Sequence, residues 1–306
     1  MELNFVLDDG SIFEVISNYK SGQIDRIELN NVISDFNFLS DSIRSHSVGA
    51  IYSNVGILLD CVDGENIADF IYDQNNVDRD KALSLSINID RSEKYIPEDH
   101  FSEDIYDQGG WCSCCFALST GATIVAKRTL STLAFWNDSF FMVDNESNLI
   151  ARYRSHIVHT SPSEEVIWSY SDIMWSNLYF VKENVEFKNF DLHYRNAVEI
   201  VVRHLSYLND FSQDHKQNDP DNFIGEAGSQ GVDLSPESPN THKNKDAMKE
   251  RWVSIGGESV LCEWHTKLQP QIDRIHFNIG SSLSHSVSNI TKGKVVIGIF
   301  TDHLTV

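Results

Sequence analysis

The clearest alternation of polar and apolar positions lies near the end of the chain, in the stretch CEWHTKLQPQIDRIHF. Successive side chains of a β-strand point to opposite faces, so a period of two indicates strands over 260–268 and 274–279. The five residues QPQID between them can close an antiparallel pair. A third apolar run over 294–301 is expected to add another strand. The pattern therefore predicts a small antiparallel sheet with one apolar and one polar face.

The polar face of this predicted sheet concentrates ionisable side chains. In the first predicted strand the polar side chains occupy alternate positions, and the second predicted strand has the same arrangement. If the strands pair as expected, the following side chains share one surface: Glu263, His265, Lys267, Arg274 and His276. The alternative is that this surface is only the solvated side of a half-buried sheet.

The rest of the chain mixes strand and helix patterns. The opening LNFVLDDGSIFEVI places Asp-Gly between two short apolar runs and predicts a β-hairpin. From 133 to 159, apolar runs separated by ND and NESN predict an antiparallel meander. Apolar residues then recur at spacings of three and four over 192–208, which predicts a helix that Asp191 can cap. The fold class expected is α+β.

Composition divides the chain into three parts. Residues 212–244 are rich in Asp, Asn, Ser and Gly and hold three of the six prolines, so we expect a polar linker, or a lid that orders on contact. Residues 1–211 then form a larger acidic α+β body. Residues 245–306 form a small β module that is richer in basic residues and histidine.

Charge and hydropathy restrict the possible partners. The net charge of −21 argues against general binding to nucleic acid, but residues 241–306 hold eight Lys and Arg against six Asp and Glu. An anionic substrate would therefore meet this last segment. No apolar run is long enough to cross a bilayer and the start lacks the pattern of a signal peptide, so we expect a cytoplasmic protein without a membrane partner.

Five cysteines, three of them in the stretch WCSCC, have poor spacing for a disulfide framework, and we expect reduced thiols. Cys112, Cys114 and Cys115 offer three thiolates for zinc, although buried small apolar side chains are the simpler interpretation.

The residue types of the polar face match the needs of RNA cleavage without a metal. A carboxylate or imidazole can take the 2′-hydroxyl proton, a second group can protonate the leaving oxygen, and Lys and Arg can stabilise the phosphorane charge. An alternative uses Glu263, His265 and His276 as metal ligands. The neighbouring Lys267 and Arg274 argue against it, so no metal or cofactor is expected.

The segments CEWHTKL, DRIHF and KVVIGIFTDHL together resemble the closing strands of the RelE and HigB group of bacterial toxins. The resemblance covers residues 250–306 and implies a small α+β ribonuclease that cuts mRNA on the ribosome without a metal. It implies phosphate-handling or acid/base roles for Lys267, Arg274 and His303. It has no counterpart for the acidic body.

These observations predict a bacterial effector, toxin-like or acting in phage defence, whose C-terminal module is an endoribonuclease. We expect the acidic body to bind a protein partner and the module to bind RNA, in association with the ribosome. The catalytic candidates are the five residues of the polar face, and the candidates for substrate binding are Arg251, Lys294 and His303. The alternative is a non-catalytic protein whose C-terminal sheet recognises a phosphate-bearing or acidic ligand or a protein partner.

Overall fold

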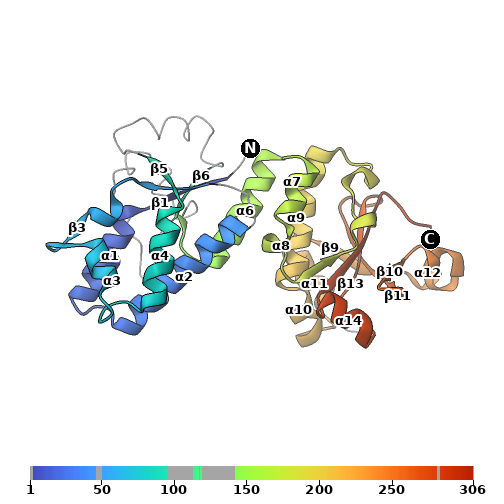
Figure 1. Cartoon of the computed structure of the whole chain (residues 1–306). Coiled ribbons are helices and arrows are strands. Elements are labelled where there is room, and N and C mark those ends of the chain that lie inside the picture. Colours follow the sequence, from blue (N-terminus) through green and yellow to red (C-terminus); the bar gives the residue numbers. More distant parts are fainter. Residues whose placement is uncertain are drawn as a thin grey trace. The chain divides into compact units, whose positions relative to one another are not determined.

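The computed structural model is α+β, as the sequence predicts, and its chain divides into two compact units, Met1–Pro162 and Ser163–Val306 (Figure 1). Each unit has its own five-stranded sheet. The structure describes residues 3–45, 50–95, 113–116, 118, 142–280 and 283–305.

The five-stranded sheet of the first unit is parallel throughout, with strand order β5-β2-β1-β6-β7. Its central strand β1 carries Phe5, Val6 and Leu7, all buried, as expected for a strand covered on both faces. The strands are β1 (Asn4–Leu7), β2 (Ile51–Asn54), β5 (Glu93–Tyr95), β6 (Ser113–Phe116) and β7 (Met142–Val143).

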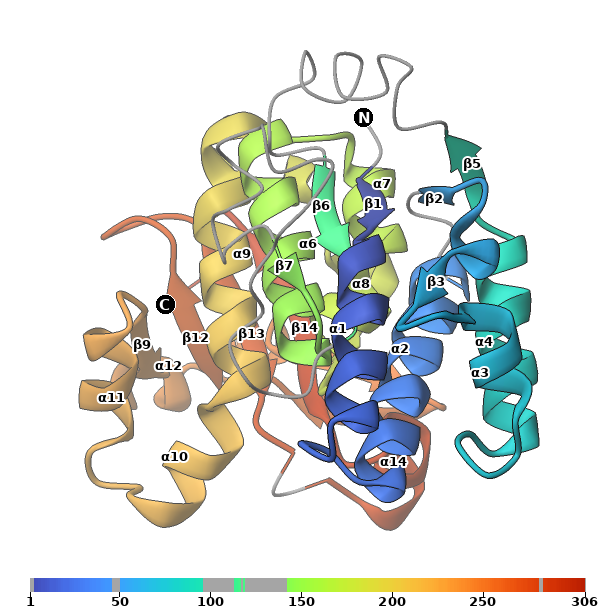
Figure 2. The same ribbon diagram turned by 90° about the vertical axis from the view of Figure 1, so that its left-hand side faces the viewer.

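Amphipathic helices surround this sheet, and α2 packs against both α1 and α4 (Figure 2). In α2 the buried apolar residues recur at spacings of three and four, which forms one apolar stripe. The helices are α1 (Asp9–Lys20), α2 (Arg26–Ser45), α3 (Ile67–Tyr72), α4 (Arg79–Asp90) and α6 (Glu146–Thr160). Between β2 and α3 lie a 3₁₀ turn, η1 (Ile57–Leu59), and a short antiparallel pair, β3 (Cys61–Val62) and β4 (Glu65–Asn66).

Two strand predictions for this unit are wrong. The expected second strand of the opening hairpin lies in α1, where Ile12, Val15 and Ile16 are spaced to bury one helical face. The last part of the expected meander is α6, in which Leu149, Tyr153 and Ile157 recur every four residues. The earlier part of the meander, up to residue 141, lies outside the described residues. Short apolar runs fit both the period of two of a strand and the spacing of three and four of a helix. Packing in the folded chain selects the helix in both segments.

The second unit has a mixed sheet of order β8-β14-β13-β12-β9, in which only β8 and β14 run parallel. The strands expected over 274–279 and 294–301 are present, but the one expected over 260–268 is shorter and begins at Trp264. A bulge in the β13–β14 pairing lies between His276 and Phe277. The strands are β8 (Leu178–Phe180), β9 (Asp233–Pro236), β12 (Trp264–Lys267), β13 (Arg274–Asn278) and β14 (Val295–Thr301).

Helix α9 (Tyr194–Asp210) confirms the helix predicted from the spacing of apolar residues, and Ala197, Val198, Val201 and Leu205 are buried. Its N-cap is His193 rather than Asp191. The Asp273 carboxylate instead accepts the N–H groups of Asp191 and Leu192, at 2.7 and 3.1 Å. The beginning of the helix is therefore tied to the turn between β12 and β13.

The segment expected to be a linker is largely helix and strand. It contains α10 (Ser212–Asn218), α11 (Phe223–Ser229), strand β9 and α12 (Pro239–Lys243), and it buries Phe223, Val232 and Leu234. Because β9 pairs with β12, this segment completes the sheet. The boundary between the two compact units lies instead at residues 162 and 163.

The two faces of the mixed sheet are covered differently. On one face His204 of α9 lies 2.9 Å from the Thr266 hydroxyl. On the other, the hairpin of β10 (Trp252–Ile255) and β11 (Glu258–Leu261) packs a cluster that includes Cys262 and Val296. A Cβ at Gly298 would lie 2.3 Å from the Cys262 sulfur, so this close approach requires glycine.

Short helices complete the second unit. They are α7 (Glu164–Ser169), α8 (Ser171–Met174), η5 (Lys182–Asn184), η6 (Phe187–Asn189), α13 (Lys245–Lys249) and α14 (His285–Thr291).

Candidate functional site

His265 on β12 and His276 on β13 lie directly opposite each other in the antiparallel register. Their ring centroids are 5.1 Å apart. The two imidazoles therefore share a face, as the alternation predicts. They are not solvated: His265 is 7% exposed and His276 is fully buried. At this pair, the interpretation as a plain solvated sheet face is wrong.

Lys267 and Arg274 also face each other across β12 and β13, one pair further along the same face. The Lys267 ammonium lies 3.2 Å from Asp233 on the neighbouring strand β9. Arg274 is half-buried and forms no ion pair with any residue in the described part of the chain. One of these two cations is neutralised, and the other is available to an anion.

Glu263, the fifth residue of the expected set, lies before β12 and does not join the two histidines. Its carboxylate is 3.0 Å from His242 Nε2 at a partly exposed position. The carboxylate that does meet the histidines belongs to Glu237, which directly follows β9. The alternation of Asp233, Ser235 and Glu237 could have identified it, but the polar composition around these residues indicated a linker.

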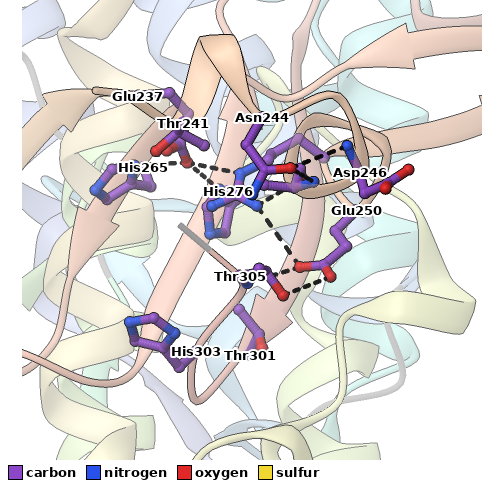
Figure 3. A network of polar contacts seen from close by, with 12 residues as sticks. Glu237, Thr241, Asn244, Asp246, Glu250, His265, His276, Thr301, His303 and Thr305 are labelled. Carbon is purple, nitrogen blue, oxygen red and sulfur yellow. Dashed lines mark hydrogen bonds and ion pairs between the residues drawn. The ribbon is translucent and has the colours of Figure 1, made fainter. Parts of the chain in front are cut away.

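Glu237 is the centre of a buried polar cluster (Figure 3). Its Oε1 accepts a hydrogen bond from Arg251 Nε at 3.0 Å. The same oxygen lies 3.5 Å from His265 Nδ1 and 3.6 Å from His276 Nδ1. On the other side of the His265 ring, Nε2 is 3.1 Å from the Ser235 hydroxyl. Ser235, His265 and Glu237 thus form a continuous polar chain across the edge of the sheet.

Burial determines the charges of this cluster. Desolvation lowers the pKa of His276 to about 3, so this imidazole is neutral at pH 7. Burial also opposes ionisation of Glu237, but the nearby His265 and the hydrogen bond and positive charge of Arg251 outweigh it and lower the pKa of Glu237 to about 2. At neutral pH the cluster therefore holds the carboxylate–guanidinium pair and a neutral His276.

A cavity of about 200 Å³ lies beside the cluster. Seven of its nine lining residues are polar, and they supply two guanidinium groups, an imidazole, a carboxylate and hydroxyl groups. The lining residues are Ser235, Pro236, Glu237, Ser238, Thr241, Arg251, His265, Arg274 and Leu304. His276 is not among them, because it lies behind His265.

The three residues expected to bind substrate occupy different places. Arg251 lines the cavity, but it is 2% exposed and its Nη1 also donates to the Ala247 carbonyl at 2.7 Å. Lys294 precedes β14 at the end of the sheet opposite to Arg274, which pairs with Thr301. His303 is exposed in the segment after β14. That segment is held by Thr305, whose N–H and hydroxyl each donate to Glu250 at 2.7 Å.

Two of the three clustered cysteines belong to the described residues. Cys112 lies outside the described residues, and Cys114 and Cys115 are in β6. Cys262 is a free buried thiol in the second unit, and burial raises its pKa to about 12.

No protein-family model, curated protein or solved structure matches this chain. Within the described ranges, no helix has the length and apolar character required to span a bilayer.

Proposed function

We propose that the second unit is an endoribonuclease that cleaves RNA by general acid/base catalysis without a metal. The observation that carries this proposal is the cavity lined by the half-buried Arg274 and the imidazole of His265. Arg274 has no ion pair within the described residues, and the imidazole contacts the Glu237 carboxylate. We further propose that the protein is a bacterial effector of the toxin or phage-defence type.

The cavity has the chemistry of a phosphate site. Arg274 can form paired hydrogen bonds with two phosphate oxygens, as guanidinium groups commonly do. Hydroxyl groups of Ser235, Ser238 and Thr241 line the same cavity and can donate to a phosphate oxygen. A single phosphodiester with part of its ribose fits this chemistry better than an extended duplex, because the cavity volume is only about 200 Å³.

His265 is the proposed general base. The Glu237 carboxylate lies on the Nδ1 side of its ring, which favours the tautomer with the proton on Nδ1 and leaves Nε2 as the acceptor. Nε2 takes the 2′-hydroxyl proton as that oxygen attacks phosphorus. The bond to the 5′-oxygen breaks, and this oxygen takes a proton from water. The products are a 2′,3′-cyclic phosphate and a 5′-hydroxyl end.

The other expected catalytic residues take different roles in this proposal. Arg274 stabilises the charge of the phosphorane. Lys267 contributes a positive potential that is partly offset by Asp233. His276 does not line the cavity, so we assign it a positioning role behind His265 rather than the role of a second acid/base group.

The first unit is proposed to bind a protein partner. Residues 1–162 contain 25 Asp and Glu against 11 Lys and Arg, so this unit repels RNA and favours a basic protein surface. An association of the second unit with the ribosome remains part of the proposal, since the ribosome presents both mRNA and basic proteins.

The test is incubation of the purified full chain with a defined single-stranded RNA in the presence of EDTA. We expect products with 2′,3′-cyclic phosphate ends, and no cleavage when the RNA carries a 2′-deoxy substitution at the scissile position. The matched variants are Arg274→Ala, which should cleave much more slowly, and Lys294→Ala, which removes a cation at the other end of the sheet and should retain activity.

Two results would decide against the proposal. Cleavage of the 2′-deoxy substrate would exclude attack by the 2′-hydroxyl. The non-catalytic alternative would be favoured if the protein binds RNA without ever cleaving it and Arg274→Ala weakens that binding.

A further inference from the structure

Three potential metal ligands meet in the interior of the second unit. Glu237, His265 and His276 each offer one donor atom, and these atoms all lie within 4.8 Å of one another. All three side chains are buried. They come from strand β12, strand β13 and the residue after β9, so the backbone of one sheet holds them in place.

The spacing of the donor atoms fits a tetrahedral ion. Glu237 Oε1 lies 3.5 Å from His265 Nδ1 and 3.6 Å from His276 Nδ1. With zinc–ligand bonds of about 2.0–2.1 Å, two ligands of a tetrahedron are about 3.3 Å apart. A shift of a few tenths of an ångström would therefore place these atoms around one ion.

A second observation is independent of this spacing. His276 is fully buried, and neither of its ring nitrogens has a hydrogen-bond partner, nor does His265 Nδ1. Buried polar atoms without a partner are costly and rare in folded proteins. The unpartnered Nδ1 atoms of both rings approach Glu237, which is where an ion would satisfy them.

We propose that Glu237, His265 and His276 form a binding site for Zn²⁺ or a chemically similar divalent transition metal. Two histidines and one glutamate are a ligand set that zinc accepts with water in the fourth position. Glu237 and His265 also line the cavity, so that water can reach the ion from there. This is the metal arrangement considered for the sequence, with Glu237 in place of Glu263.

Arg251 opposes the site and provides a test of it. Its Nε is 3.0 Å from Glu237 Oε1, so a cation lies within one hydrogen bond of a ligand oxygen. The guanidinium can remain as the outer partner that orients the carboxylate, but its charge weakens metal binding. Removing the charge should therefore strengthen binding while the ligand set is unchanged.

Metal at this site would affect the activity, and this step rests on the proposed function. When a metal occupies Nδ1 of His265, the ring proton moves to Nε2, which then donates to Ser235 and can no longer accept a proton. Zn²⁺ should therefore inhibit RNA cleavage, and EDTA should restore it.

The full chain is first stripped of metal with EDTA and dialysed. Titration calorimetry with ZnCl₂ then measures the affinity and the number of ions bound, and the visible absorption of Co²⁺ reports on the same site. We expect one ion per chain. Affinity should fall by more than about 10-fold in His276→Ala and His265→Asn, and rise in Arg251→Gln. The controls are His242→Ala and His303→Ala, which remove exposed histidines and should bind zinc as the unchanged protein does.

Folding of each variant is checked by its melting temperature, and His265→Asn, at the cavity, decides the matter if His276→Ala does not fold. Equal zinc affinity in the ligand variants and in the controls would overturn the site. Zn²⁺ that binds and accelerates RNA cleavage would overturn the inhibitory step and the metal-independent mechanism together. A chain that binds zinc as expected but cleaves no RNA under any condition would refute only the proposed function.

Discussion

Arg251 Nε donates to Glu237 Oε1 at 3.0 Å, and both side chains are almost completely buried, at 2% and 4% exposure. A buried pair of this kind contributes little compared with an apolar replacement, but removing one partner leaves an isolated charge in the interior. The pair therefore constrains what can be substituted at the candidate site.

Arg251→Ala should lower the free energy of unfolding by about 3–5 kcal/mol, because Glu237 would remain buried without its partner. Urea unfolding followed by circular dichroism measures this change. The matched control is Lys249→Ala, which breaks an exposed ion pair with Asp246 and should change stability by less than about 1 kcal/mol. Equal effects of the two substitutions would show that the Arg251 pair is not buried in solution.

Arg274→Ala should lower the rate of RNA cleavage by roughly 100-fold or more, the range found when one preorganised electrostatic donor is lost. Lys267→Ala should act in the same direction with a smaller effect, because Asp233 already offsets its charge. Single-turnover kinetics separate these changes from binding, which should weaken less. Full activity in both variants would remove the polar face from the mechanism.

His204 should make the second unit less stable in acid. Burial lowers its folded pKa to about 4, whereas the pKa of an unfolded histidine is 6.5. Between these values the unfolded chain binds more protons, so the stabilising contribution is complete above about pH 6.5 and is lost as pH falls towards 4. From pH 7.5 to pH 5 this histidine should account for a loss of roughly 2 kcal/mol.

Urea unfolding of the unchanged protein and of His204→Gln at both pH values isolates this contribution from the other titrating groups. The glutamine variant should lose less stability on acidification. A pH dependence identical in the two proteins would contradict the lowered pKa.

Asp273 should stabilise the start of α9 through its carboxylate. It is buried, adopts φ +60, and accepts two backbone N–H groups that precede the helix. Asp273→Ala loses these two hydrogen bonds and a third from Gln269 Nε2, and it places a less suitable residue in the left-handed region, so we expect a loss of about 2–4 kcal/mol. Asp273→Asn keeps the backbone preference and should lose less.

The control for this position is Asp302→Ala, which alters an exposed neighbour whose backbone carbonyl accepts the Asp273 N–H. Thermal unfolding measures all three variants. A stability of Asp273→Ala equal to that of Asp302→Ala would mean that the turn does not anchor the helix.

The sequence by itself determined the elements whose periodicity is strong. Alternation in the last third of the chain identified the strands that carry His265 and His276, and their placement on one face follows directly from the pleat of a strand. Apolar spacing likewise identified α9. The α+β class follows because both patterns occur in the chain. A period of two buries one face of a strand, and spacings of three and four bury one face of a helix.

Only the tertiary structure determined which side chains contact one another. Glu237 meets the two histidines only because β9 pairs with β12, and nothing local to its polar surroundings reveals that pairing. The same holds for the opening of the chain, where Ile12, Val15 and Ile16 suit either a strand or a helix and packing against α2 selects the helix. Local spacing specifies which face a side chain occupies, but burial and long-range strand pairing specify what it meets there.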